Sequence, residues 1–274
     1  MNIATLAERV KAFQALHDAP GVFVIPNPWD AGSACILAGL GFKALATTSS
    51  GHAFTLGRSD GGVSRDELMD HIGILSVATH LPINADLENC FSDDPLEAAE
   101  TIRLAQEAGA AGGSIEDYSG HDGGRIYDYD HAVERVAAAV EAARSLPVPF
   151  VLTARAENLI RGRDDLDDTI RRLQAFENAG ADVLYAPGLK TADDVRAVCS
   201  AVSKPVNVLA TPSLTVEEIA AAGGKRISVG GSLARTAIGG LLDAAQEILD
   251  TGAFAPFGDA PSFPMINELV GKAR

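Results

Sequence analysis

Short apolar runs alternate along the chain with longer segments whose apolar residues recur at helical spacing. The runs end in polar, glycine or proline residues, which is typical of buried strands. Their nearly unbroken apolar character is typical of parallel strands that are covered on both faces. The pattern predicts eight strands, at residues 22–26, 44–48, 82–86, 113–117, 150–155, 182–186, 205–209 and 226–230.

The segments between these runs carry helix start and stop signals. Pro95 stands in a first turn after Asp94, Gly109 follows the end of the same segment, and Thr191 precedes two acids. Helices are predicted at residues 66–79, 94–108, 130–145, 164–179 and 232–250, with two more starting after Thr191 and Thr215.

Strands that alternate with helices imply parallel pairing, with the helices outside the sheet. We therefore expect a single α/β domain over residues 1–274, a (β/α)8 TIM barrel. An open doubly wound sheet is the alternative, but no G-x-G-x-x-G run follows the first strand. Residues 251–274 hold three prolines before a short helical pattern, and this tail packs on its own barrel or on a neighbouring subunit.

Composition and net charge limit the classes of molecule that the protein could bind. The chain has 274 residues, 47% of them apolar, and its 22 basic and 37 acidic residues give a net charge of −15. This charge argues against nucleic-acid binding, which needs a cationic face. The three cysteines are far apart, so neither a disulfide framework nor structural zinc is expected, and a cytoplasmic location suits them. We see no signal peptide and no apolar stretch long enough to cross a membrane.

Acidic residues stand at the predicted strand ends, where a barrel holds its chemistry. Asp86 and Glu88 alternate after the third strand, Glu116 ends the fourth, and Asp60 lies in the loop after the second. Converging carboxylates would repel one another unless a hard cation such as Mg²⁺, with Mn²⁺ as a substitute, balanced them. The alternative is that the acids cap helices or pair with Arg155 at the end of the fifth strand.

Other rim residues suggest substrate contacts, each with a structural alternative. The hydroxyl-rich segment 47–51 could hold a carboxylate through its backbone N–H groups, or it is a plain serine-rich turn. Arg155 suits a carboxylate or an enolate oxygen, or it pairs with Glu88 or Glu116. The glycine-rich loop 118–129, which includes His121, is either a mobile lid or an ordinary loop. Asp117 and Glu157 could equally be structural partners.

Taken in order, the motifs N-P-W-D-A-G-S-A, T-T-S-S-G, D-x-E-N, S-I-E-D, T-A-R-A-E and K-P-V-N-V resemble the isocitrate lyase/phosphoenolpyruvate mutase superfamily. The resemblance covers about residues 15–245. It implies an α/β barrel, usually tetrameric, whose last helices swap between subunits. It also implies Mg²⁺ and an enolate-like state formed from 2-oxo acids or their precursors.

The resemblance implies a set of site residues. Asp86 resembles the principal Mg²⁺ carboxylate, assisted through waters by Asp60, Glu88 and Glu116. Arg155 resembles the substrate-binding arginine, and Asn207 a residue that meets a distal carboxylate. The remaining residues in matching substrate-binding segments are Trp29, Asp30, Thr48, Ser49, Ser50 and Gly51.

One segment departs from the best-known members. Isocitrate and methylisocitrate lyases carry K-[KR]-C-G-H after the fourth strand, and the mutase and phosphonopyruvate hydrolase use a lysine and an asparagine there. This chain has S-G-H-D-G-G-R instead. The pattern therefore resembles the oxaloacetate decarboxylase-like or dimethylmalate lyase-like branch.

The resulting hypothesis is a Mg²⁺-dependent lyase that cleaves a C–C bond of a 2-oxo or 2-hydroxy carboxylic acid, with Arg155, Glu116 and Asp60 as catalytic groups. The substrate would be a small di- or tricarboxylate, and the assembly a homotetramer built as a dimer of dimers. Two alternatives stay open. One is P–C chemistry, as in phosphonopyruvate hydrolase or phosphoenolpyruvate mutase, and the other is a non-catalytic 2-oxo acid binding protein.

Overall fold

The computed structural model describes residues 5–120 and 123–273. Eight parallel strands pair in the order β1-β8-β7-β6-β5-β4-β3-β2. A backbone hydrogen bond of 3.0 Å from Ala46 N to Pro26 O joins the ends of the two edge strands, so the sheet closes on itself. The strands are β1 (Phe23–Ile25), β2 (Leu45–Ala46), β3 (Ile83–Asp86), β4 (Gly112–Glu116), β5 (Val151–Arg155), β6 (Val183–Tyr185), β7 (Val206–Leu209) and β8 (Arg226–Ser228).

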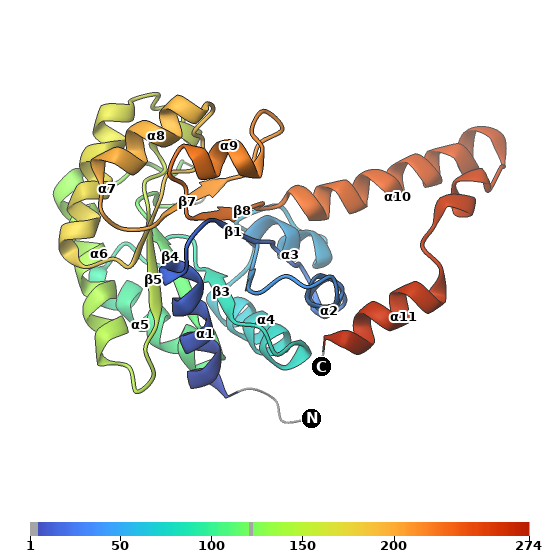
Figure 1. Cartoon of the computed structure of the whole chain (residues 1–274), viewed down its shortest axis with the longest axis horizontal. Coiled ribbons are helices and arrows are strands. Elements are labelled where there is room, and N and C mark those ends of the chain that lie inside the picture. Colours follow the sequence, from blue (N-terminus) through green and yellow to red (C-terminus); the bar gives the residue numbers. More distant parts are fainter. Residues whose placement is uncertain (1–4, 121–122, 274) are drawn as a thin grey trace.

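Helices follow the strands along the chain, and most of them surround the sheet, as Figure 1 shows. They are α1 (Leu6–Asp18), α2 (Ala31–Gly39), α3 (Ser49–Thr55), α4 (Arg65–Ala78), α5 (Pro95–Glu107), α6 (Tyr129–Ser145), α7 (Leu166–Ala179), α8 (Ala192–Ala201), α9 (Val216–Ala221), α10 (Ser232–Thr251) and α11 (Phe263–Lys272), with 3-10 turns η1 (Asn158–Ile160) and η2 (Ala255–Asp259). The (β/α)8 barrel and its eight strands are confirmed.

Local sequence explains several helix ends. Thr191 and Thr215 each form a capping box with an acid three residues later, which satisfies orphan N–H groups at the starts of α8 and α9. Gly180 ends α7 in a left-handed conformation, with φ of 107°. The helix α3 was not expected, because its first residues look like a serine-rich turn. Thr48 caps it by accepting a hydrogen bond from Gly51 N.

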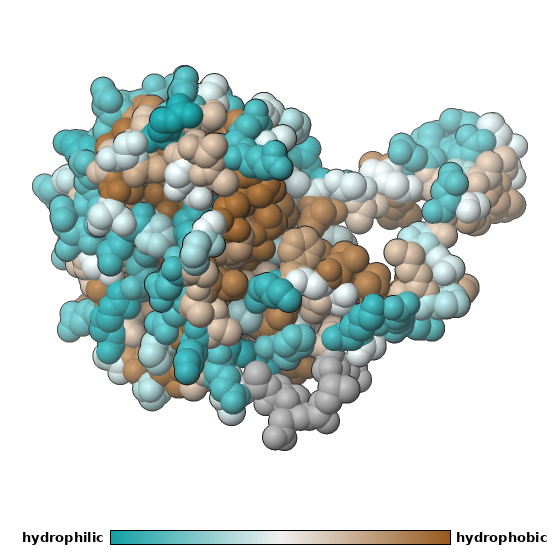
Figure 2. Space-filling model, in the orientation of Figure 1, coloured by the Kyte–Doolittle hydropathy of each residue, from teal (hydrophilic) through white to brown (hydrophobic). Residues whose placement is uncertain are grey.

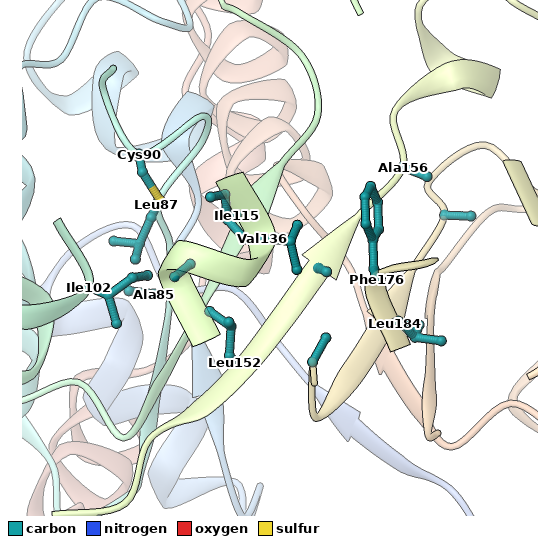
Figure 3. Close-up of a cluster of buried hydrophobic side chains, with 14 of the residues drawn as sticks. Ala85, Leu87, Cys90, Ile102, Ile115, Val136, Leu152, Ala156, Phe176 and Leu184 are labelled. Carbon is teal, nitrogen blue, oxygen red and sulfur yellow. The ribbon is translucent and has the colours of Figure 1, made fainter. Parts of the chain in front are cut away.

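The main core lies between the outer face of the sheet and the surrounding helices. Ala85, Leu87, Ile115, Leu152 and Leu184 come from strands or their ends and are fully buried. Figure 3 shows them facing side chains of the outer helices, among them Ile102, Val136 and Phe176. This packing buries the apolar outer face of the strands and leaves the polar strand ends at the barrel mouth.

The C-terminal part forms a projecting arm, residues 232–273, made of α10, η2 and α11. The helix α10 points away from the barrel, and α11 returns to pack against α2 of the same chain (Figure 1). The approach is close, because a Cβ on Gly39 of α2 would overlap the Leu269 carbonyl of α11. Packing of the tail on its own barrel is thus observed, and swapping between subunits stays a prediction.

No helix in the described ranges combines the length and the apolar character needed to cross a membrane.

Candidate active site

A polar cavity of about 920 Å³ opens at the carboxyl ends of the strands. Most of the residues predicted for the site come together here, although the sequence scatters them over more than 150 positions. The predicted residues that line the cavity are Thr48, Ser49, Ser50, Asp60, Asp86, Glu88, Glu116, Arg155 and Asn207. The parallel strands bring them to one end of the barrel.

Arg155 is the central cation of this cavity. Its Nη1 donates to Asp86 Oδ1 at 2.6 Å, and its Nε and Nη2 donate to Glu157 Oε1 at 3.0 and 2.8 Å. Nη2 also lies 3.1 Å from Glu116 Oε2. Burial opposes the charge, but the three carboxylates outweigh it and raise the pKa of Arg155 well above its usual value. Of the two expected ion-pair partners, Glu116 is confirmed.

Two carboxyl groups at the mouth hold protons more tightly than usual. Burial, followed by repulsion from Asp86 and Asp60, raises the pKa of Glu88 to about 7. Burial, followed by repulsion from Glu157, raises the pKa of Glu116 well above its usual value. Among the described residues that line the cavity, four are acidic and three are arginines, and a divalent cation would relieve the repulsion that contributes to these raised pKa values.

Asp86 has one carboxylate oxygen that the protein barely uses. Its Oδ1 accepts from Arg155, whereas among the described residues its Oδ2 meets only Ser49 N, at 3.5 Å. Within residues 5–120 and 123–273, no three His, Cys, Asp or Glu side chains are close enough to hold a metal ion among them. The donor set nevertheless fits a hard cation that binds one carboxylate directly and keeps several waters, as Mg²⁺ commonly does.

The segment 48–51 approaches the rest of the mouth closely. Thr48 and Ser50 have hydroxyl oxygens 3.3 Å apart. A Cβ on Gly231, at the start of α10, would come within 2.5 Å of Ser50 Oγ. Asn27 links three strand ends, because its amide donates to Thr47 O and its carbonyl accepts from the N–H groups of Val229 and Gly230. These contacts fix the hydroxyl-rich turn relative to the ends of β1 and β8, and Asp86 N donates to Thr47 Oγ1 at 2.7 Å, which links the turn to β3.

Two predicted site residues, Asp30 and Asn207, have protein partners of their own, as does Asp117, which follows Glu116. Asp30 caps α2 by accepting from Ser33 N at 2.7 Å, and neither Asp30 nor Trp29 is among the lining residues. Asn207 lines the cavity, but its amide already bonds Arg226 Nε and Ser228 Oγ. Asp117 is buried and serves as a structural partner, since it accepts from Glu157 N and from Arg172.

In the described part of the loop 118–129, Tyr118 and Ile126 form an antiparallel bridge. Its predicted lid role stays a prediction, and His121 lies outside the described residues.

The structure adds cavity residues that the sequence analysis did not single out. Tyr185 lies below Arg155, with the guanidinium carbon 5.1 Å from its ring centre. Arg226 lines the floor, and Arg161 and Tyr118 stand together at the rim. Tyr185 and Arg226 lie in predicted strands, where alternation alone could have marked them as inward-facing polar residues. Arg161 lies beyond the strand, and only its spacing of four from Glu157 hints at its position.

The comparisons with known proteins agree with this geometry. The sequence family described as phosphoenolpyruvate phosphomutase matches residues 13–249. The 2-methylisocitrate lyase of Escherichia coli K12 is 30% identical over 77% of this chain and 75% of its own length. The oxaloacetate decarboxylase of Bradyrhizobium diazoefficiens is 28% identical over 72% of this chain and 69% of its own.

A solved structure from Burkholderia cenocepacia J2315 is 55% identical, with a TM-score of 0.93, and covers 96% of this chain and 95% of its own. Its description, a provisional lyase/mutase assignment, names no substrate. The family match, the closed barrel and the acid-rich mouth thus agree, and the chain is an enzyme of the isocitrate lyase/phosphoenolpyruvate mutase superfamily.

Proposed function

We propose that this enzyme cleaves a C–C bond of a 2-oxo or 2-hydroxy carboxylic acid through an enolate, with oxaloacetate-like decarboxylation as the simplest case. The observation that carries the proposal is the placement of Arg155 Nη1 2.6 Å from Asp86 Oδ1 at a polar cavity. A fixed cation beside the expected metal carboxylate stabilises negative charge where an enolate would form.

Asp86 would hold Mg²⁺ directly, and Glu88, Asp60 and Glu116 would help through waters. When bound, the metal supplies Lewis-acid polarisation of the 2-oxo group. Mn²⁺ would substitute, because both ions accept oxygen ligands.

The chain's own residues supply the remaining steps. The turn at Ser49 and Ser50 orients the substrate carboxylate, and Arg155 donates to the 2-oxo oxygen. As the bond between C3 and C4 breaks, CO₂ leaves and its bonding electrons form the enolate. Glu116, whose pKa is raised by burial and by repulsion from Glu157, would then deliver a proton to C3. The product is the 2-oxo acid shortened by one carbon.

P–C bond chemistry is a second candidate because the matching sequence family is described as a phosphomutase. The loop 118–129 opposes this candidate. It contains neither lysine nor asparagine, and its basic residues are only His121 and Arg125. A phosphonate dianion would therefore meet little positive charge there.

A substrate panel with Mg²⁺ tests the proposal. Oxaloacetate, methylisocitrate, dimethylmalate and phosphonopyruvate are incubated with the enzyme, with an EDTA control. We expect turnover of a C–C substrate that EDTA abolishes. Phosphate release from phosphonopyruvate alone would favour the second candidate. Binding of these acids without any turnover would point to the non-catalytic alternative.

The functional assembly is, on this proposal, a homo-oligomer. Large apolar side chains on the arm are exposed, including Leu241, Leu242 and Leu249 of α10 at 67%, 63% and 79%. Figure 2 shows apolar residues along the arm and on the barrel beside its base. Exposed apolar surface of this extent is typical of subunit contacts, and a dimer of dimers would cover it.

A further inference from the structure

A second arginine, Arg161, stands at the rim of the cavity with a freer guanidinium than Arg155. It follows the turn η1, and its side chain is 36% exposed against 12% for Arg155. Both arginines line the same cavity. The rim therefore holds a second cation, Arg161, apart from Arg155, which contacts Asp86.

The donors of Arg161 are hardly used by the protein. Its Nη2 lies 3.3 Å from Glu157 Oε2 and 3.8 Å from Glu116 Oε1, and in the described part of the chain its guanidinium makes no hydrogen bond. Arg155, by contrast, donates three hydrogen bonds to Asp86 and Glu157. Arg161 thus retains N–H groups for a ligand, whereas most of those of Arg155 are engaged.

The guanidinium is also held in place before any ligand arrives. Its central carbon lies 3.9 Å from the centre of the Tyr118 ring, a distance typical of cation–π stacking. The Arg161 N–H bonds to Glu157 O and Asn158 O, which anchors the backbone of the turn. Stacking occupies the face of the guanidinium and leaves its N–H edge, which matches a carboxylate, open to a ligand apart from the ion pairs of Nη2 with Glu157 and Glu116.

We propose that Arg161, stacked on Tyr118, binds the distal carboxylate of the substrate and makes the enzyme selective for dicarboxylates. The inference rests on the proposed function, in which Asp86 and Arg155 hold the proximal 2-oxo acid. Glu88, Glu116 and Glu157 surround this position, so a monoanionic carboxylate suits it better than a phosphonate dianion.

The test compares two ligands that differ only in the distal group. Malate and 2-hydroxybutyrate share the proximal 2-hydroxy acid, and only malate has a second carboxylate. Binding of each is measured by calorimetry with Mg²⁺ for the wild type, Arg161→Gln and Arg163→Gln. Arg163 lies on the same turn but pairs with Asp168 outside the cavity, so its variant controls for lost charge and for disturbance of the turn.

We expect the wild type and Arg163→Gln to prefer malate by about 10–100-fold, as one charged hydrogen-bonded pair provides. Arg161→Gln should lose this preference and bind 2-hydroxybutyrate as before, and Arg161→Lys should restore part of it. An unchanged preference in Arg161→Gln would overturn the inference, as would an equal loss for both ligands. Phosphonopyruvate binding that exceeds oxaloacetate binding and depends on Arg161 would overturn the choice of a carboxylate.

The outcomes of this test distinguish a failure of the Arg161 subsite from a failure of the proposed lyase reaction. Malate preference that depends on Arg161, without turnover of any panel substrate, would support the subsite and reject the lyase reaction. Turnover of oxaloacetate with the same KM in Arg161→Gln would support the lyase and reject the subsite. If both the subsite and the lyase reaction are correct, Arg161→Gln should raise KM for oxaloacetate more than it lowers kcat.

Discussion

The imidazole rings of His52 and His71 stack face to face in the interior, with ring centres 3.8 Å apart and planes 14° from parallel. His52 belongs to α3, which begins in the hydroxyl-rich turn 48–51, and His71 belongs to α4. Both side chains are buried, so the pair fastens the short helix α3 to the barrel. Two protonated rings could not remain stacked at this distance in a site of low dielectric.

This pair should make the protein unstable in weak acid. Burial, followed by the neighbouring His52, lowers the pKa of His71 to about 4, and burial also lowers the pKa of His52. The unfolded chain binds these protons first, near the ordinary histidine pKa of about 6.5. The stabilisation is therefore complete above that pH and is lost as pH falls toward 4.

Urea unfolding at several pH values would measure the effect in His71→Phe. The variant should show a shallower fall in unfolding free energy between pH 6.5 and 4, by up to about 1.4 kcal/mol per pH unit. Above pH 8 the variant and wild-type curves should run parallel, which serves as the internal control. Equal acid slopes in the two proteins would show that this histidine does not govern acid stability.

Asp86→Ala should abolish turnover and leave the fold intact. Arg155 would still pair with Glu116 and Glu157, so the substitution does not leave a buried cation without an ion-pair partner. The expected loss is at least about 10²–10³-fold in kcat, comparable to removing a major electrostatic contact in a transition state. Activity at saturating Mg²⁺ and the melting temperature should be measured together. Near-normal activity in a stable variant would refute the metal assignment.

The overall architecture follows from the sequence because barrel strands carry a strong local signal. Residues 150–155 and 205–209 are apolar, β-rich and bounded by helices, and both form strands as expected. The acids at the mouth could also be grouped in advance, since parallel strands must end on one side. Asp86, Glu116 and Arg155 therefore lie together as predicted.

The partners of each side chain could not be predicted in the same way. Whether Arg155 pairs with Glu88 or with Asp86 depends on rotamers and distances across the barrel, which no local pattern encodes. Arg161 binds its ring partner Tyr118 across two loops, so neither residue stands out in the sequence alone. The sequence does not predict helix α3 because its cap and its first serines have turn-like composition, and burial of its central residues Gly51, His52 and Ala53 decides the structure.

Gly51→Ala should disturb the hydroxyl-rich turn 48–51, which we propose orients the substrate carboxylate. A Cβ at this position would lie 2.6 Å from Thr48 Cγ2 and 3.0 Å from Trp29 Cβ, so α3 would have to shift. Overpacking of this kind costs about 1–3 kcal/mol. The melting temperature should fall, and KM should rise because Ser49 and Ser50 move with the helix. Gly73→Ala in α4 is the matched control, since its Cβ would meet nothing closer than 3.9 Å. If both variants behave alike, the close packing at Gly51 is not what requires glycine.

Gly39→Val should release α11 from α2 and weaken assembly. The Leu269 carbonyl of α11 lies directly over Gly39, and no side chain fits between them. If α11 swaps between subunits, the partner's α11 would pack on the same surface of α2. The substitution would therefore block both the packing of α11 within one chain and its packing on a partner. Light scattering should show an oligomer for the wild type and smaller species, or aggregates, for Gly39→Val.

The matched control is Gly240→Ala, because a Cβ at Gly240 in α10 would meet no atom within 4 Å. A monomeric wild-type protein would reject the proposed assembly. An intact oligomer in Gly39→Val would show that the contact of α11 with α2 does not hold the subunits together.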